Sequence, residues 1–351
     1  MKDLAKDRFS SQVALVSDAE TELKILTLNS VLRKEEYGTT NKKVMQVINK
    51  YIAELESDEV KRNVKTTLTN YASRVYLEWV KIFGTAAVGV VLLATLKAKG
   101  INIPQGVQTT LRELPTERQL PDYVYNRTVP NGIYPYEYEK QINAVLDSCA
   151  KEDYSERYSL RASVERQLRA EWQQKQLDGL KDSGERFVWI DEHANCSERC
   201  QDWQGKLYSL DGTSGNVDGI NFRPLEDATE RYETTKSGKT YKNGTLTGFN
   251  CRHKAIPYRK GNKPIEIPAD VIERQRAIEQ RQRELERNCR KYETRALGYK
   301  EIKENAVDKT EKTRGLKLYK HNRQLVTKWR SEYESFCRKN KVPIYRSRLS
   351  V

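Results

Sequence analysis

Two histidines and three cysteines within one turn-rich stretch are the residues best suited to chemistry in this chain. They are His193, Cys196, Cys200, Cys251 and His253. Zn²⁺ prefers imidazole nitrogen and thiolate sulfur, and a structural zinc site takes four such ligands in a tetrahedron. The spacings are irregular for a zinc finger. The sequence therefore predicts a structural zinc site with five candidate ligands for four places.

Two other interpretations of this cluster stay open. The side chains can be buried thiols and imidazoles without a metal, or they can hold a catalytic ion. Catalysis needs an open coordination position and a free general base. If both histidines are ligands, only His321 remains, in a Lys-rich helix, and the carboxylates directly before the first histidine are Asp191 and Glu192. The chain has no Walker-type, GxGxxG or GxSxG motif. We therefore expect a protein that is not an enzyme.

The residues around the cluster resemble a known family. HANCSERCQDWQGKLYSLDG (193–212) and GFNCRH (248–253), with the preceding YSLRASVERQ (158–167), are similar to the phage minor capsid protein 2 family, related to phage head-morphogenesis proteins. Cys200 stands where that family usually has a second histidine, an exchange that preserves a zinc ligand. The resemblance implies His193, Cys200, Cys251 and His253 as the four ligands, with Cys196 as a substitute. It implies structural roles for Trp203, Gln204, Gly205 and Lys206.

The same resemblance implies a function. We expect a minor head protein of a tailed bacteriophage, located in the virion inside the capsid near the portal, which assists head assembly. Its expected partners are the major capsid protein, the portal and packaged DNA. The first residues lack the apolar core of a signal peptide, so we expect synthesis in the host cytoplasm. The alternative is a mobile-element nucleic-acid-binding accessory protein, or a metal-dependent nuclease, that is absent from virions.

The positive charge is concentrated in the last quarter of the chain. The 351 residues carry a net charge of +14. Residues 259–351 hold 26 Lys and Arg against 13 Asp and Glu, a net +13, so the rest of the chain is close to neutral. Such a segment attracts phosphate backbones or acidic protein surfaces. We expect non-specific DNA binding through 259–351, the alternative being a solvated helical face.

The most apolar stretch, Ile82–Leu96, has 15 residues, fewer than the roughly 20 that a bilayer span needs. We interpret it as a buried core helix and expect no membrane contact. The alternative is a protein that is ejected with the DNA and contacts the host membrane through this stretch.

The predicted fold class is α+β and predominantly α-helical. Apolar spacing predicts helices near residues 44–55, 60–79, 271–299 and 318–336, and FVWI predicts a strand at 187–190. Charged residues spaced i, i+4, such as Arg161 and Glu165, predict a further helix at 154–180. We expect four regions: an N-terminal helical bundle (1–100), a Pro/Tyr-rich extended connector (101–153), a minor-capsid core with the turn-rich Cys/His module (154–262) and long basic C-terminal helices (263–351). The apolar stripe of 271–299 is narrow and predicts a helix that lies on a partner.

Overall fold

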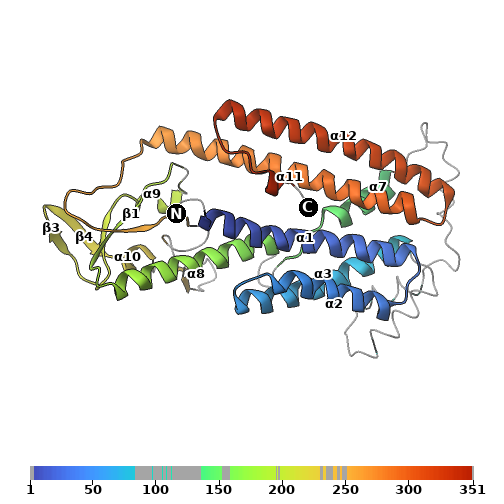
Figure 1. Ribbon diagram of the computed structural model, residues 1–351, viewed down its shortest axis with the longest axis horizontal. Coiled ribbons are helices and arrows are strands. Elements are labelled where there is room, and N and C mark those ends of the chain that lie inside the picture. The colour runs from blue at the N-terminus through green and yellow to red at the C-terminus, as the bar shows by residue number, and fades with distance from the viewer. Residues whose placement is uncertain are drawn as a thin grey trace. The chain divides into compact units, whose positions relative to one another are not determined.

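The computed structural model describes residues 4–83, 97, 105, 108, 112, 136–151, 159–194, 196, 198–229, 232–234, 240–242, 246 and 251–349. The chain is mostly helical with a small mixed sheet, as the predicted fold class requires (Figure 1). It forms two compact units. Unit 1 comprises residues 1–162 and 285–351, and unit 2 comprises residues 163–284. The four-region division expected from the sequence stays a prediction.

Three long helices at the N-terminus of unit 1 pack on one another. They are α1 (Leu4–Leu32), α2 (Tyr37–Ala53) and α3 (Asp58–Phe83). The helical spacing predicted α2 and α3, and Ser57 caps α3 by accepting a hydrogen bond from the Val60 amide at 3.3 Å. Leu23, Ile48, Leu68 and Trp79 are fully buried between the helices. This apolar core explains why the three helices form.

Helix α1 also buries charge. Glu20 and Lys24 lie inside unit 1, where Lys24 Nζ donates to the Leu146 carbonyl at 2.9 Å. Burial raises the pKa of Glu20 to about 7 and lowers the pKa of Lys24. Leu146 belongs to α7 (Tyr136–Asp147), so the ammonium connects α1 to the end of that helix.

The helix α7 corrects the expectation of an extended connector over 101–153. It follows Pro135 directly and contains no proline, and Ile142, Val145 and Leu146 are buried at helical spacing. The predicted connector between 101 and 135 lies outside the described residues, apart from residues 105, 108 and 112, and so does the predicted core helix beyond Phe83. Among the described helices, none is long and apolar enough to cross a membrane.

Two long C-terminal helices pair within unit 1. Helix α11 (Ala269–Asn305) enters the unit at Leu285, and α12 (Lys309–Asn340) packs along it. Tyr292 stacks on Trp329 with ring centroids 6.3 Å apart, and the Glu293 carboxylate accepts from Arg323 and Arg330. The narrow apolar stripe of α11 predicted a partner, and within unit 1 Leu285 and Tyr292 contact α12 while Tyr299 contacts Asn143 of α7. A short 3₁₀ turn, η1 (Arg346–Arg348), is the last element among the described residues.

Unit 2 is built on a five-stranded sheet whose order is β3-β4-β2-β1-β7. Its strands are β1 (Phe187–Ile190), β2 (Leu207–Ser209), β3 (Gly215–Val217), β4 (Ile220–Pro224) and β7 (Ala255–Pro257). The strand predicted at 187–190 is confirmed as β1, which pairs antiparallel with both β2 and β7. β2 and β4 are parallel, and β3 and β4 are antiparallel. A two-stranded sheet is formed by β5 (Tyr232–Thr234) and β6 (Thr240–Lys242).

Helices α8 (Leu160–Asp182), α9 (Glu198–Gln201) and α10 (Glu226–Thr229) complete this unit, with the first turns of α11. Its core joins Val188, Ile190 and Tyr208 of the sheet to Leu177 of α8. Cys196, Cys200 and Cys251 belong to the same buried cluster. The cysteines singled out by the sequence therefore occupy the centre of a small core.

Candidate metal centre

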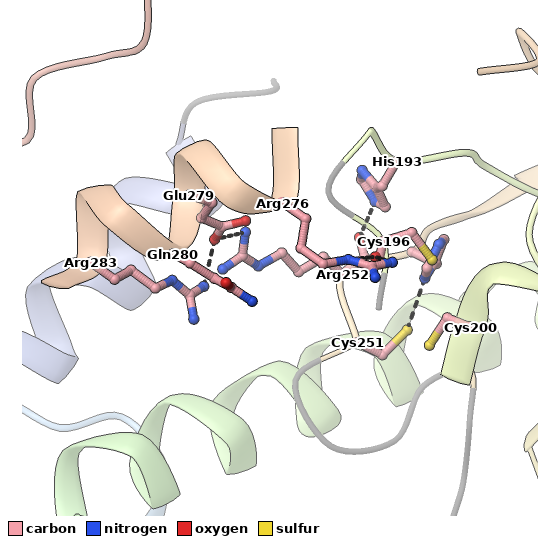
Figure 2. Close-up of a pocket in the computed structure, with 10 residues that line it drawn as sticks. His193, Cys196, Cys200, Cys251, Arg252, Arg276, Glu279, Gln280 and Arg283 are labelled. Atoms are coloured by element: carbon pink, nitrogen blue, oxygen red, sulfur yellow. Dashed lines mark hydrogen bonds and ion pairs between the residues drawn. The ribbon is translucent and has the colours of Figure 1, made fainter. Parts of the chain in front are cut away.

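The antiparallel pairing of β1 with β7 brings the distant parts of the Cys/His cluster together. Ile190 is the register partner of Ala255, so the residues after β1 and the residues before β7 lie at the same end of the sheet. The short helix α9 supplies Cys200. As a result, all five residues predicted from the sequence line one pocket of about 230 Å³ (Figure 2).

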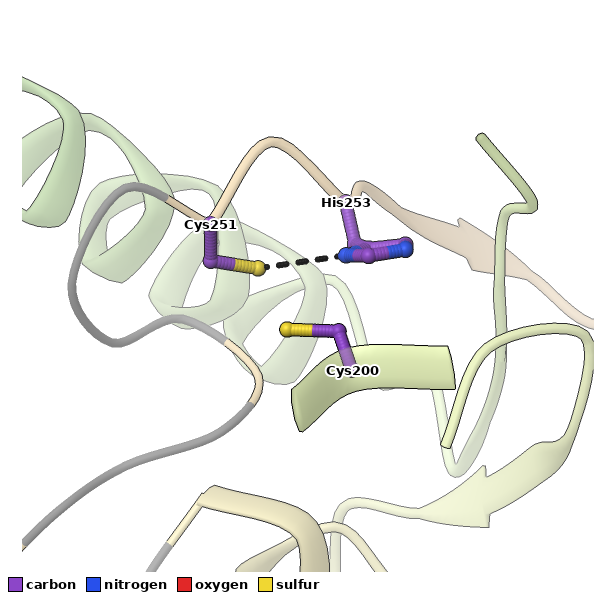
Figure 3. A group of neighbouring side chains, drawn as sticks. All are labelled: Cys200, Cys251 and His253. Atoms are coloured by element: carbon purple, nitrogen blue, oxygen red, sulfur yellow. Dashed lines mark hydrogen bonds between the residues drawn. The ribbon is translucent and has the colours of Figure 1, made fainter. Parts of the chain in front are cut away.

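Three of the five residues come closest to a ligand set. One ligand atom each from Cys200, Cys251 and His253 lies within 4.8 Å of the others, and all three side chains are buried (Figure 3). Cys251 Sγ and His253 Nδ1 are 3.3 Å apart. Two sulfurs and one imidazole nitrogen converging in this way can hold a metal ion.

Cys196 lies directly beside this group. Its thiol is hydrogen-bonded to the Cys200 side chain, and this bond, followed by burial, raises the pKa of Cys196. Adjacent thiols resist ionisation because two thiolates repel each other, whereas a bound cation favours deprotonation of both. Cys196 lines the same pocket, outside the group of three converging ligand atoms.

His193 has a different surrounding. Its Nε2 donates to the Arg252 carbonyl at 2.7 Å, and the Asp191 carboxylate lies 3.6 Å from the same nitrogen. Its ring centroid is 4.9 Å from that of His253, but it lies outside the group of converging ligand atoms. Burial lowers the pKa of His193. Of the four ligands that the resemblance implied, the structure thus brings three together. His193 and Cys196 both line the same pocket, outside this group of three.

Gln204 determines which nitrogen of His253 faces the sulfurs. An amide oxygen can only accept, so His253 Nε2 donates to Gln204 Oε1, at 2.9 Å. The lone pair is then on Nδ1, which faces Cys251. The same oxygen accepts from the His193 amide at 3.0 Å. Metal-binding histidines usually donate their second nitrogen to such a partner, which fixes the ring orientation. Spacing alone did not reveal this role, although Gln204 lies in the WQGK block.

Further contacts fix the loops that carry the ligands. The side chain of Gln173, from α8, donates to the carbonyls of Cys251 and His253, at 3.1 Å each. Gly205 has a φ of +68°, and a Cβ at this position would collide with the Glu192 carboxylate. Gly205 therefore forms a turn that a residue with a Cβ could not adopt without strain, next to the Gln204 side chain that contacts His253.

The backbone engages the two carboxylates that directly follow β1. Asp191 Oδ1 accepts from the Lys254 amide, and Glu192 Oε2 accepts from the Ile267 amide, both at 2.6 Å. Both carboxylates therefore act as connectors between the end of β1 and other segments of unit 2.

One wall of the pocket is formed by the first turns of α11 and is rich in arginine (Figure 2). Arg276 donates through Nε and Nη2 to the Cys196 carbonyl, at 3.0 and 2.6 Å. Arg252 and Arg283 both pair with Glu279 at 2.6 Å. If Cys196 were a third thiolate ligand, a divalent ion would leave one net negative charge, which this cationic wall would offset. The donor set and its surroundings fit a structural Zn²⁺.

Comparison with known proteins gives one match. The family model described as Phage minor capsid protein 2 matches residues 137–336, which is more than half of the chain. No curated protein and no solved structure matches. The matched range contains the sheet of unit 2 and all five residues of the Cys/His cluster. The chain therefore belongs to the phage minor capsid protein 2 family.

Proposed function

We propose that this protein is a non-enzymatic minor component of a tailed-phage head, located inside the capsid near the portal. The observation that carries the proposal is the family match over residues 137–336. In this role the chain contacts the major capsid protein, the portal and packaged DNA, and assists head assembly. It is made in the host cytoplasm and incorporated into the virion.

Mass spectrometry of gradient-purified virions tests this role. We expect peptides of the chain at low copy number relative to the major capsid protein. Protease treatment of intact particles should leave the chain uncut, and treatment of opened particles should degrade it. Absence from purified particles would favour the alternative of a nucleic-acid-binding accessory protein.

The centre of unit 2, in this proposal, is a structural zinc site. Cys196, Cys200, Cys251 and His253 are its four ligands. The convergence of Cys200, Cys251 and His253 supports three of them, and the hydrogen bond of His193 Nε2 to the Arg252 carbonyl favours Cys196 over His193 as the fourth. When bound, the ion supplies folding free energy to a module with a small apolar core. A closed set of four protein ligands leaves no position for substrate or water, which is typical of structural zinc and not of a nuclease.

Metal analysis separates the two ligand sets. We expect about one zinc per chain in the purified protein. Cys196→Ser should release the ion to a weak chelator, whereas His193→Asn should retain it. The reverse result would support the ligand set that the family resemblance implied.

A further inference from the structure

The positive charge of the C-terminal region is unequally divided between its two helices. Helix α11 contains ten Lys and Arg and eight Asp and Glu, a net +2. Helix α12 contains ten Lys and Arg and only three Asp and Glu, a net +7. The basic character that the sequence assigned to 259–351 therefore resides mainly in α12.

Burial increases this difference. Eight of the Lys and Arg residues of α12 are exposed, whereas none of its acidic residues is: Glu311 is buried, and Glu332 and Glu334 are partly buried. On α11 the exposed residues include four acids as well as bases. The four acids are Asp270, Glu273, Glu284 and Glu304. We call the side of α12 that carries its exposed lysines, from Lys309 to Lys339, its outward face. The exposed charged residues of α12 are therefore all positive, whereas those of α11 are positive and negative.

Ion pairing within the protein neutralises part of α11 and little of the outward face of α12. On α11, Lys291 and Arg295 pair with Asp147, and Arg281 pairs with Glu284. On α12, the exposed Arg323 and Arg338 have carboxylate partners. In the part of the chain that the structure describes, no carboxylate pairs with Lys312, Lys320 or Lys339.

The cationic residues are arranged along one side of the helix. Gly315, Leu318, Asn322, Val326 and Tyr333 recur at helical spacing and form the buried side. The exposed lysines lie on the other side, at positions 309, 312, 317, 320, 328 and 339. At 1.5 Å per residue they extend over about 45 Å, more than the roughly 34 Å of one turn of B-DNA.

We propose that the outward face of α12 is the surface that binds double-stranded DNA through its phosphate backbone. The inference rests on the proposed function in a DNA-filled head and assigns the contact to one helix face. Lysine is a flexible point charge suited to phosphates, and Lys312, Lys320 and Lys339 of this face have no carboxylate partner among the described residues. Binding is therefore independent of base sequence and decreases steeply with salt.

Fluorescence anisotropy with the full-length protein and two duplexes of unrelated sequence tests the proposal. The variant Lys312→Gln, Lys320→Gln, Lys339→Gln removes three charges from α12. The control Arg274→Gln, Arg287→Gln, Lys300→Gln removes three exposed charges from α11, so the net charge of the two variants is equal. Circular dichroism checks that both retain their helices.

We expect the α12 variant to lose at least about tenfold in affinity for both duplexes. The slope of log affinity against log salt should fall by about 0.9 for each lost phosphate contact, or about 2.7 in all. The α11 control should keep the wild-type slope. Equal loss in both variants would mean that only total charge matters, and unchanged binding would mean that α12 faces something else; each overturns the proposal. Virion membership, measured separately, is unaffected by either result.

Discussion

At the scale of single residues, Gln204 controls the candidate metal centre without contributing a ligand. Its Oε1 accepts from both His253 Nε2 and the His193 amide. Removal of this oxygen leaves a buried imidazole N–H without an acceptor and lets the ring turn away from Cys251. Both effects weaken the metal site and do not remove any ligand atom.

We therefore expect Gln204→Leu to weaken zinc binding by about 10- to 100-fold, the usual effect of losing an outer partner of a metal-bound histidine. Competition with a chromophoric chelator measures this affinity. Gln201→Leu is the matched control, because Gln201 is an exposed glutamine of the neighbouring α9. Equal affinities for the two variants would show that Gln204 does not orient His253.

The Gly205 turn gives a second prediction at this scale. Gly205 and Gly212 both have positive φ, +68° and +77°, but only Gly205 has a neighbour where a Cβ would lie. Both alanine variants incur backbone strain of about 1 kcal/mol or more, while Gly205→Ala also displaces the Glu192 carboxylate from the Ile267 amide. We expect Gly205→Ala to lower the free energy of unfolding by about 1–3 kcal/mol more than Gly212→Ala. Denaturant titration checks this, and equal losses would contradict the steric argument.

Residue type and spacing were sufficient to find the cluster but not to choose its members. The side chains of His193 and Cys196 are three residues apart, and the direction of each depends on the turn after β1, which the sequence does not specify. The structure directs His193 towards a carbonyl and Cys196 towards Cys200. Gln204 is a neutral amide with no ligand signature, so its role became visible only through its hydrogen bonds.

At the scale of elements, the pairing of α11 and α12 depends on a close backbone approach. A Cβ at Gly315 of α12 would lie 2.8 Å from the backbone nitrogen of Lys303 on α11. Backbone cannot move aside as a flexible side chain can, so the two helices must separate to admit even a methyl group.

We expect Gly315→Ala to destabilise unit 1 by about 1–3 kcal/mol, although alanine favours a helix by up to about 1 kcal/mol relative to glycine. Gly38→Ala in α2 is the control, since a Cβ added there would meet nothing within 4 Å and the same unit contains it. Thermal unfolding followed by circular dichroism compares the two. A stabilised Gly315→Ala would show that α11 and α12 are not in close contact there.

The buried Glu20 on α1 gives unit 1 a pH dependence. Its pKa is raised to about 7, first by burial, against the effects of Lys24, the Ala150 amide and Arg161. In the unfolded chain the carboxyl ionises near 4.5, so between about 4.5 and 7 the folded state binds more protons. The contribution of Glu20 to the free energy of unfolding is therefore present at low pH and is lost as pH rises to about 7. The loss is at most about 3 kcal/mol.

We expect Glu20→Gln to abolish this part of the slope, since the amide preserves size and polarity but does not titrate. The free energy of unfolding is measured at intervals from about pH 5 to pH 8, roughly the window in which the shifted group titrates. As pH rises, this free energy should fall less steeply in Glu20→Gln than in the wild type. Glu59→Gln, at an exposed position of α3, is the control. Parallel curves for wild type and Glu20→Gln would mean that Glu20 is not buried as an acid.

Periodicity predicted long helices because each buries one apolar stripe. The segment FVWI predicted β1 because all four of its residues are apolar and either aromatic or β-branched. It did not predict the parallel pairing of β2 with β4. Those strands have three and five residues, and their order is decided by contacts far apart in sequence. Helix α7 was missed because the prolines before it dominated the local pattern.

At the scale of the whole molecule, the two units have different sources of stability. The described core of unit 1 is a set of long helices with fully buried Leu, Ile, Tyr and Trp side chains. Unit 2 has strands of three to five residues, and three of the buried residues in its core are the cysteines of the candidate metal centre. The chain passes between the units inside α8 and α11. Loss of the metal should therefore affect one unit first.

We expect a strong chelator, or Cys251→Ser, to destabilise unit 2 by several kcal/mol, because structural zinc contributes about 10–16 kcal/mol of binding free energy in small modules. Hydrogen exchange should show loss of protection in β1 while the amides of α2 and α3 remain protected. Cys149→Ser is the control, since Cys149 is a partly buried cysteine of unit 1 outside the cluster. Full protection of β1 in chelator would mean that the thiols and imidazole form an ordinary core without an ion. Simultaneous loss in both units would mean that α8 and α11 couple them into one cooperative fold.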